Sequence, residues 1–332
     1  MILDIDLAQA WHRNELFLDG YDSTEGSMNG GELKRVVVAG GSGLVGRHLV
    51  ETLAGQGTPV TVLSRDPRRV DLPAGATASG YEDLPGVLEG ADAVINLAGA
   101  SIAGKRWNEK YKRELLESRV GGTSRLVEAM ARCAAKPGAL VNASAIGFYG
   151  PHHGEPVAEQ TPEGKGFLAS LCAAWERVAD GALGLGIRVV KLRSGVVLTK
   201  RGGALAKLVL PMKLFQGTKL GHGQQGFSWI HIDDSVGLYL EAARNPAWSG
   251  PINGTAPRPL TNETFTRLLG AQMHRPVLPV PGFMTEIGVK ILLGEMASEV
   301  LEGAFVYPAR ALELGYTFKF EKAEDALADL LG

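Results

Sequence analysis

The most constraining feature of the sequence is a glycine-rich turn between an apolar strand and a helix, in RVVVAGGSGLVGRHLVETLAGQG. The run Val36–Ala39 is typical of a buried strand, and apolar residues at helical spacing follow the turn. Glycines allow a tight turn, and their backbone N–H groups can approach a diphosphate at the positive N-terminus of the helix. We predict a dinucleotide-binding unit here, and a turn without a ligand is the alternative. Its candidate cofactor-binding residues are Gly40, Gly41, Ser42, Gly43, Leu44, Val45 and Gly46.

Apolar strand-like runs alternate with amphipathic helical segments along most of the chain, which is the pattern of a parallel sheet covered by helices on both faces. We therefore predict an α/β fold with a doubly wound parallel sheet of the Rossmann type. The predicted strands are Val36–Ala39, Val60–Leu63, Ala93–Leu97, Leu140–Ala143 and Val189–Leu192. The predicted helices are Leu44–Ala54, Trp107–Cys133, Phe167–Leu183, Ile232–Ala243, Thr261–Met273 and Thr285–Gly294.

The 332 residues divide into three predicted segments. Residues 1–34 are an N-terminal extension that ends in a linker rich in Gly, Ser, Asp and Asn. Residues 35–195 form the nucleotide-binding domain, whose sheet later segments are expected to complete. Residues 196–332 contain longer irregular loops and clustered prolines, which indicate a smaller α+β lobe. We expect this lobe to cover the crevice at the carboxyl ends of the strands and to carry the substrate specificity.

Composition excludes several classes of function. The formal net charge is −2 and no long Lys/Arg run is present, so we expect no nucleic-acid partner. No stretch reaches about 18 apolar residues, and the N-terminus lacks the pattern of a signal peptide, so we expect no membrane association. The two cysteines are too few for a disulfide framework, so we expect free thiols and a reducing cytoplasm. The histidines form no recurrent set with other ligands, so we predict no metal. The expected partner is a small-molecule substrate, and a homodimer is compatible with the sequence.

The end of the second predicted strand, in TPVTVLSRD, bears on the choice of cofactor. A carboxylate in this place normally accepts hydrogen bonds from the adenosine ribose. Here Ser64 and Arg65 follow the strand and can donate to a 2′-phosphate, which favours NADP over NAD. If the strand boundary shifts by a residue or two, Asp66 becomes the ribose carboxylate instead. Arg68 and Arg69 are expected to belong to a solvated loop.

Four motifs, GGSGLVG, NLAGA, NASAIGFYG and FSWIHIDD, resemble those of extended short-chain dehydrogenases/reductases. The further matches NLAGASIAGKRW, LRSGVVL and MASEVLEGAFVYPARALELGYTFKF resemble the atypical group labelled sugar-nucleotide epimerase-like or cell-division-inhibitor-like oxidoreductases. The resemblance runs from about Arg35 to Leu331. It implies an NAD(P) cofactor, a doubly wound sheet and a small C-terminal substrate lobe. It also implies cofactor contacts from Asn96, Leu97, Ala98 and Gly99.

The sequence departs from the superfamily at the catalytic positions. The resemblance places Ser144 at the serine position, but Leu168 and Cys172 stand where the usual Tyr and Lys would be. Arg119 replaces the usual upstream Asn. In the ordinary mechanism the Tyr transfers a proton, while the Lys lowers its pKa and holds the nicotinamide ribose. The usual acid/base pair is therefore absent.

Several polar residues remain as candidates near the expected nicotinamide. Ser144 and Tyr149, which we expect to project from the following loop into the crevice, are hydrogen-bonding acid/base candidates. Arg119 would stabilise developing negative charge or bind an anionic group, and its alternative is an ion pair with Glu114 or Glu117. Cys172 is either a reactive thiol or, as we prefer, a small buried core residue.

These features predict an NADP-dependent oxidoreductase or epimerase-like enzyme that acts on a small carbonyl or hydroxyl compound. The alternative, from a different class, is an NADP-binding sensor or interaction scaffold with reduced catalysis, for example one linked to cell division. A nucleotide-sugar epimerase is a third hypothesis, which the missing Tyr and Lys weaken.

Overall fold

The computed structural model describes residues 31–152 and 155–332, so most of the predicted N-terminal extension lies outside the described residues. Its centre is a seven-stranded sheet in the order β11-β7-β5-β4-β1-β2-β3, in which every neighbouring pair is parallel. Three two-stranded sheets lie outside it within the described residues. The central strands are β1 Val36–Ala39, β2 Val60–Leu63, β3 Ala76–Ser79, β4 Ala93–Asn96, β5 Ala139–Ala145, β7 Arg188–Ser194 and β11 Gly250–Gly254. The remaining strands are β6 Pro156–Val157, β8 Val196–Leu198, β9 Gly226–Phe227, β10 Trp229–His231, β12 Leu260–Thr261 and β13 Phe305–Val306.

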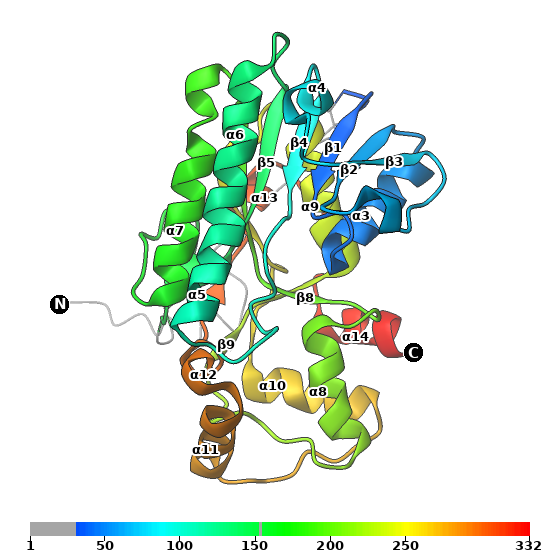
Figure 1. The fold of residues 1–332 in the computed structure, drawn as a ribbon. Coiled ribbons are helices and arrows are strands. Elements are labelled where there is room, and N and C mark those ends of the chain that lie inside the picture. Colours follow the sequence, from blue (N-terminus) through cyan, green and yellow to red (C-terminus); the bar gives the residue numbers. More distant parts are fainter. Residues whose placement is uncertain (1–30, 153–154) are drawn as a thin grey trace, which may run out of the picture.

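Helices cover both faces of the central sheet, as Figure 1 shows, because five of its strands, β1, β2, β4, β5 and β7, bury apolar side chains on both sides. Side chains of α3 and α9 pack on one face, and side chains of α4, α6 and α7 contribute to the core on the other. The helices near the sheet are α3 Leu44–Gly55, α4 Leu84–Leu88, α5 Glu109–Leu116, α6 Gly122–Arg132, α7 Phe167–Asp180, α9 Ile232–Arg244 and α13 Ala309–Glu313. The others are α8 Gly203–Lys213, α10 Asn262–Gln272, α11 Gly282–Leu293, α12 Ala297–Leu301 and α14 Ala323–Leu331.

The predicted doubly wound α/β fold is confirmed, and the differences lie in individual elements. The strands β3 and β11 were not predicted, because ATAS and GPING contain few of the β-branched and aromatic residues that mark a strand. The single helix predicted over Trp107–Cys133 is divided into α5 and α6 by a π-helical turn at Glu117–Gly121. The predicted strand Ala93–Leu97 ends one residue earlier, at Asn96.

The chain returns to the sheet after it has entered the C-terminal part. Helix α9 packs on the same face as α3, and β11 pairs with β7 from Gly250↔Val190 to Gly254↔Ser194. A second lobe built around α8, α10 and α14 has its own core, in which Trp229 and Phe265 are almost completely buried. Among the described residues, no helix is long and apolar enough to span a membrane.

Candidate functional site

The glycine turn connects β1 to α3 through a very close backbone approach. Gly40 has a φ of +81°, and a Cβ added to it would lie 2.7 Å from the carbonyl carbon of Leu97. The N–H of Gly43 donates to the carbonyl oxygen of Gly40 at 3.0 Å. A Cβ on Gly46 would lie 2.2 Å from that same oxygen. Gly40 and Gly46 are therefore required by the geometry of the turn and of the helix that follows it, and the Gly43 amide helps to close the turn.

The first backbone N–H groups of α3 are available to a ligand. Within the described part of the chain, no side chain hydrogen-bonds to the first amides of this helix, and its first turn contains no acidic residue. Unsatisfied N–H groups and the helix dipole together attract an anion to such an end. The cradle formed by Gly40 and Gly43, where added Cβ atoms would fill the turn, fits the diphosphate of a dinucleotide.

Two potential phosphate donors follow β2, the half-buried Ser64 and the exposed Arg65. The strand ends at Leu63, as predicted, so Ser64 and Arg65 follow it directly. Arg65 is exposed and forms no ion pair with a carboxylate among the described residues. Asp66 instead pairs with Arg69 at 3.3 Å, and its N–H donates to Ser64 Oγ at 3.1 Å. The strand boundary therefore does not shift toward Asp66.

The segment after β4 lies directly beside the glycine turn. Asn96 is buried, and its Nδ2 donates to Thr123 Oγ1 at 2.8 Å and to Asn142 Oδ1 at 2.7 Å. Its Oδ1 accepts from the N–H of Ala98 at 3.3 Å. The Asn96 side chain thus holds the backbone of Leu97–Gly99 in place, while that backbone faces the turn.

Ser144 stands at the carboxyl end of β5 and belongs to a buried polar network. Its Oγ donates to Glu176 Oε1 at 2.7 Å. Glu176 accepts two hydrogen bonds from Arg193, each at 2.8 Å, in a bidentate pair that is almost completely buried. Burial alone would lower the pKa of Arg193, but the hydrogen bonds to Glu176 raise it above its usual value. The sequence analysis missed both members of this pair, because their partners lie on different elements.

Tyr149 does not project into the crevice, so that expectation was wrong. Its side chain is 0% exposed and packs with Val157 and Val306, because the 3-10 turn Ile146–Tyr149 directs it into the interior. The hydroxyl donates to Asn253 Oδ1 at 2.6 Å and accepts from Arg193 at 3.0 Å. Burial raises the pKa of Tyr149 to about 12.

Cys172 lies on α7 within hydrogen-bonding reach of Ser144. Its side chain is buried, and burial raises its pKa to about 12. A thiol with this pKa is protonated at neutral pH and is a poor nucleophile. These properties favour the interpretation that Cys172 packs as a core residue. Leu168, one helical turn earlier, contacts the backbone region of Gly147.

Arg119 lies in the π-helical turn between α5 and α6, next to the segment after β4. Its guanidinium is 5.2 Å from the centre of the Trp175 ring, and a Cβ on Gly99 would lie 3.0 Å from Arg119 Cζ. The expected alternative of an ion pair was wrong, because Glu114 pairs with Lys105 and Glu117 with Arg125. Burial lowers the pKa of Arg119.

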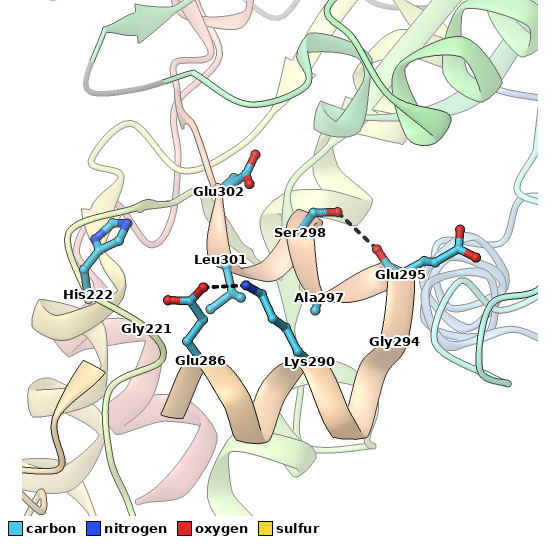
Figure 2. A pocket seen from close by; sticks show the side chains of 10 residues that line it. All are labelled: Gly221, His222, Glu286, Lys290, Gly294, Glu295, Ala297, Ser298, Leu301 and Glu302. Atoms are coloured by element: carbon cyan, nitrogen blue, oxygen red, sulfur yellow. Dashed lines mark hydrogen bonds and ion pairs between the residues drawn. The ribbon is translucent and has the colours of Figure 1, made fainter. Parts of the chain in front are cut away.

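The C-terminal lobe contributes a pocket of about 760 Å³ that the sequence analysis did not identify. Figure 2 shows Glu286 and Lys290 of α11 paired along one wall, at 2.6 Å, and Ser298 bonded to the carbonyl of Glu295 on another. A smaller pocket of about 260 Å³ shares His222 and two further lining residues with it. In the described ranges, no three His, Cys, Asp or Glu side chains are arranged to hold a metal ion.

Comparison with known proteins identifies the family. Residues 36–253 match the model of the NAD dependent epimerase/dehydratase family. The chain belongs to this family. Residues 280–330 match a second model, described as a domain of unknown function (DUF1731). The match to the first model ends at the last strand of the central sheet, and the second covers the region of α11 to α14.

Individual relatives cover most of the chain. The epimerase family protein SDR39U1 homolog, chloroplastic, from Arabidopsis thaliana is 41% identical over 89% of this chain and 86% of its own length. An epimerase family protein from Staphylococcus aureus is 36% identical, and the match covers 90% of this chain and 99% of that relative. The crystal structure of human epimerase family protein SDR39U1 (isoform2) with NADPH is 34% identical, with a TM-score of 0.80, and covers 90% of this chain and 99% of its own. UDP-glucuronic acid 4-epimerase from Bacillus cereus with NAD shares the fold at 18% identity and a TM-score of 0.70.

Proposed function

We propose that this protein is an NADP-dependent oxidoreductase or epimerase-like enzyme that acts on a small carbonyl or hydroxyl compound. The observation that carries the proposal is the uncapped start of α3 behind the turn of Gly40, Gly43 and Gly46. A dinucleotide bound there supplies a hydride acceptor or donor. The human relative that was crystallised with NADPH supports the same assignment.

The preference for NADP rests on the end of β2. Arg65 is exposed without an ion-pair partner in the described ranges, while the carboxylate of Asp66 is paired with Arg69. A free guanidinium matches a 2′-phosphate, and a carboxylate already bound to a cation is less suited to a ribose diol. NAD is the less favoured cofactor in this proposal.

The polar groups around Ser144 have distinct proposed roles. Ser144 Oγ donates a hydrogen bond to Glu176, so its oxygen lone pairs remain to accept a hydrogen bond from a substrate hydroxyl. Arg193 donates to both carboxylate oxygens of Glu176 and thereby holds Glu176 in place as the acceptor of that hydrogen bond. Tyr149 is a positioning residue that holds Arg193, and Cys172 lines the site as an uncharged neighbour of Ser144.

The test is turnover by the purified full chain. NADPH is mixed with a panel of aldehydes and ketones, and its oxidation is followed by loss of absorbance. Nucleotide sugars are incubated with the oxidised cofactor, and epimerisation, which consumes no cofactor, is followed by chromatography of the sugars. We expect at least one carbonyl to be reduced, and NADPH to be preferred over NADH. Binding of NADPH without turnover of any compound would contradict an enzymatic role and would leave a cofactor-binding protein.

The second candidate is the NADP-binding sensor or scaffold, and one observation favours it. Leu168 and Cys172 supply neither a titratable phenol nor a cation on the face of α7 that meets Ser144. The double variant Leu168→Tyr, Cys172→Lys tests this directly. Turnover that appears only in the double variant would favour a sensor, and turnover already present in the natural chain would favour the enzyme.

We place the proposed activity in the cytoplasm and on a small molecule. Both cysteines are free and buried, which suits a reducing compartment. The pockets of the C-terminal lobe present Glu, Lys and His side chains, which can hydrogen-bond a polar compound.

A further inference from the structure

Arg119 is a half-buried cation whose charge no carboxylate balances within the described residues. Its one hydrogen bond to the protein there is to the carbonyl oxygen of Leu115, at 3.4 Å, and its other close neighbour is the face of Trp175. Burial costs such a guanidinium part of its hydration, as the lowered pKa of Arg119 indicates. Buried cations are usually paired, so an unpaired one beside the segment that contacts the glycine turn indicates an anionic or hydroxyl-rich ligand.

The position of Arg119 relative to the glycine turn limits what that ligand can be. Gly40 contacts the backbone of Leu97 and Ala98, and the next residue, Gly99, lies against the guanidinium. The diphosphate cradle and Arg119 are therefore neighbours along one short stretch of backbone. Gly99 has no side chain that would separate the guanidinium from a ligand lying along this stretch.

Arg119 also contacts α7, the helix whose Glu176 binds Ser144. Its guanidinium lies 5.2 Å from the centre of the Trp175 ring, and Trp175 precedes Glu176 directly on that helix. Arg119 thus lies between the backbone beside the diphosphate cradle and the helix that binds Ser144. A dinucleotide that extended from the cradle toward Ser144 would place its nicotinamide ribose and the adjoining phosphate in this interval.

We infer that Arg119 binds the nicotinamide ribose and its adjoining phosphate oxygen, and so supplies the cation that α7 lacks at Cys172. The inference rests on the proposed binding of NADP. A guanidinium has donors only, in a planar fork, which suits the two hydroxyl oxygens of a ribose or a phosphate edge. The π-helical turn that contains Arg119 adds a residue to the helical register, a feature that is frequent at functional sites.

The experiment compares the whole cofactor with its adenosine half. Binding of NADPH and of adenosine 2′,5′-bisphosphate, which lacks the nicotinamide ribose, is measured by calorimetry on the full chain. We expect Arg119→Gln to lower the affinity for NADPH by about 10–100-fold, the range for a lost hydrogen bond to a charged group. The affinity for the bisphosphate should change by less than about twofold. Arg125→Gln, a solvent-exposed neighbour on α6, is the control and should change neither.

Conservative replacement keeps the test decisive if Arg119→Gln does not fold. Arg119→Lys retains the charge but loses the planar fork, so NADPH should weaken by about threefold or more while the bisphosphate is unchanged. Equal losses for both ligands, or no loss for either, would overturn the inference while the proposed function stands. Failure of the natural chain to bind NADPH at all would overturn the proposed function itself, and this inference with it.

Discussion

Arg65 is the residue that we propose decides between the two nicotinamide cofactors. It is exposed at the end of β2, so its guanidinium is available to a 2′-phosphate. We expect Arg65→Ala to weaken NADP binding by about 1–3 kcal/mol and to leave NAD binding nearly unchanged. Calorimetry with both cofactors measures this, with Arg68→Ala in the exposed turn nearby as the control. Equal losses for NADP and NAD would show that Arg65 does not contact the extra phosphate.

Cys172 provides a second prediction at this scale. Because burial raises the pKa of its thiol to about 12, the thiolate population at pH 8 is very small. We expect no labelling of Cys172 by a disulfide reagent in the folded protein, and full labelling in denaturant. Mass spectrometry of the digested protein reads the result. Rapid labelling of the native chain that NADPH suppresses would instead support the reactive thiol.

Glu176 carries the largest expected cost to stability. Glu176→Gln would leave Arg193 buried beside a neutral amide, and breaking a buried pair costs about 3–5 kcal/mol. Denaturant unfolding measures the change. Glu128→Gln on α6, an exposed residue that accepts from Ser124, should cost less than about 1 kcal/mol. A similar, small loss for both variants would contradict the importance assigned to the buried network.

At the scale of elements, the strand–turn–helix unit of β1 and α3 makes the sharpest prediction. Gly46→Ala would force a Cβ to within 2.2 Å of the Gly40 oxygen, so the turn must shift. We expect NADPH affinity to fall by more than about 10-fold, since the cradle depends on that approach. Gly55→Ala, at the end of the same helix, meets nothing within 4 Å and should preserve affinity. Equal affinities for the two variants would remove the turn from the binding site.

The elements that the sequence predicted are those with a strong local signal. The bounds of β1 and β2 match the prediction because apolar and β-branched residues fill both and glycines or polar residues end them. The strands β3 and β11 join the sheet through their neighbours, and their own residues give little indication of it. The π-helical turn has no signal in the sequence, since its residues suit an ordinary helix equally well.

The candidate site, like the fold, was predictable only where the sequence carries a local signal. The close backbone approaches in the turn after β1 follow from glycine spacing, so the need for glycine at Gly40 and Gly46 could be predicted from the sequence alone. The direction of Tyr149 depends on a short 3-10 turn, and the Glu176–Arg193 pair joins α7 to β7. Such tertiary contacts leave no local pattern in the sequence.

At the scale of the whole molecule, we expect the buried His231 to make the free energy of unfolding depend on pH. It is buried, its Nδ1 accepts from the N–H of Asp233 at 3.1 Å, and burial lowers its pKa in the folded state. Asp233, Asp329 and Lys319 are the charged groups that act on it. The unfolded chain therefore binds a proton near pH 6.5 that the folded chain does not.

The consequence is a loss of stability as the pH falls. The contribution of His231 is fully present above about pH 6.5 and decreases below it, by at most about 1.4 kcal/mol per pH unit. His231→Asn, which keeps an acceptor for the Asp233 amide, should flatten this slope in denaturant unfolding between pH 6.5 and 5.5. His274→Asn, at an exposed position, should leave it unchanged. An identical slope in the natural chain and in His231→Asn would contradict the lowered pKa.

At this scale, we expect the molecule to bind a nicotinamide dinucleotide at the glycine turn of its parallel sheet. Calorimetric titration of the purified full chain with NADPH and with NADH tests this most directly. We predict saturable binding of one NADPH per chain, tighter than NADH, and abolished or strongly weakened by Gly46→Ala. A folded chain that releases no heat with either cofactor and gains no thermal stability from them would contradict it.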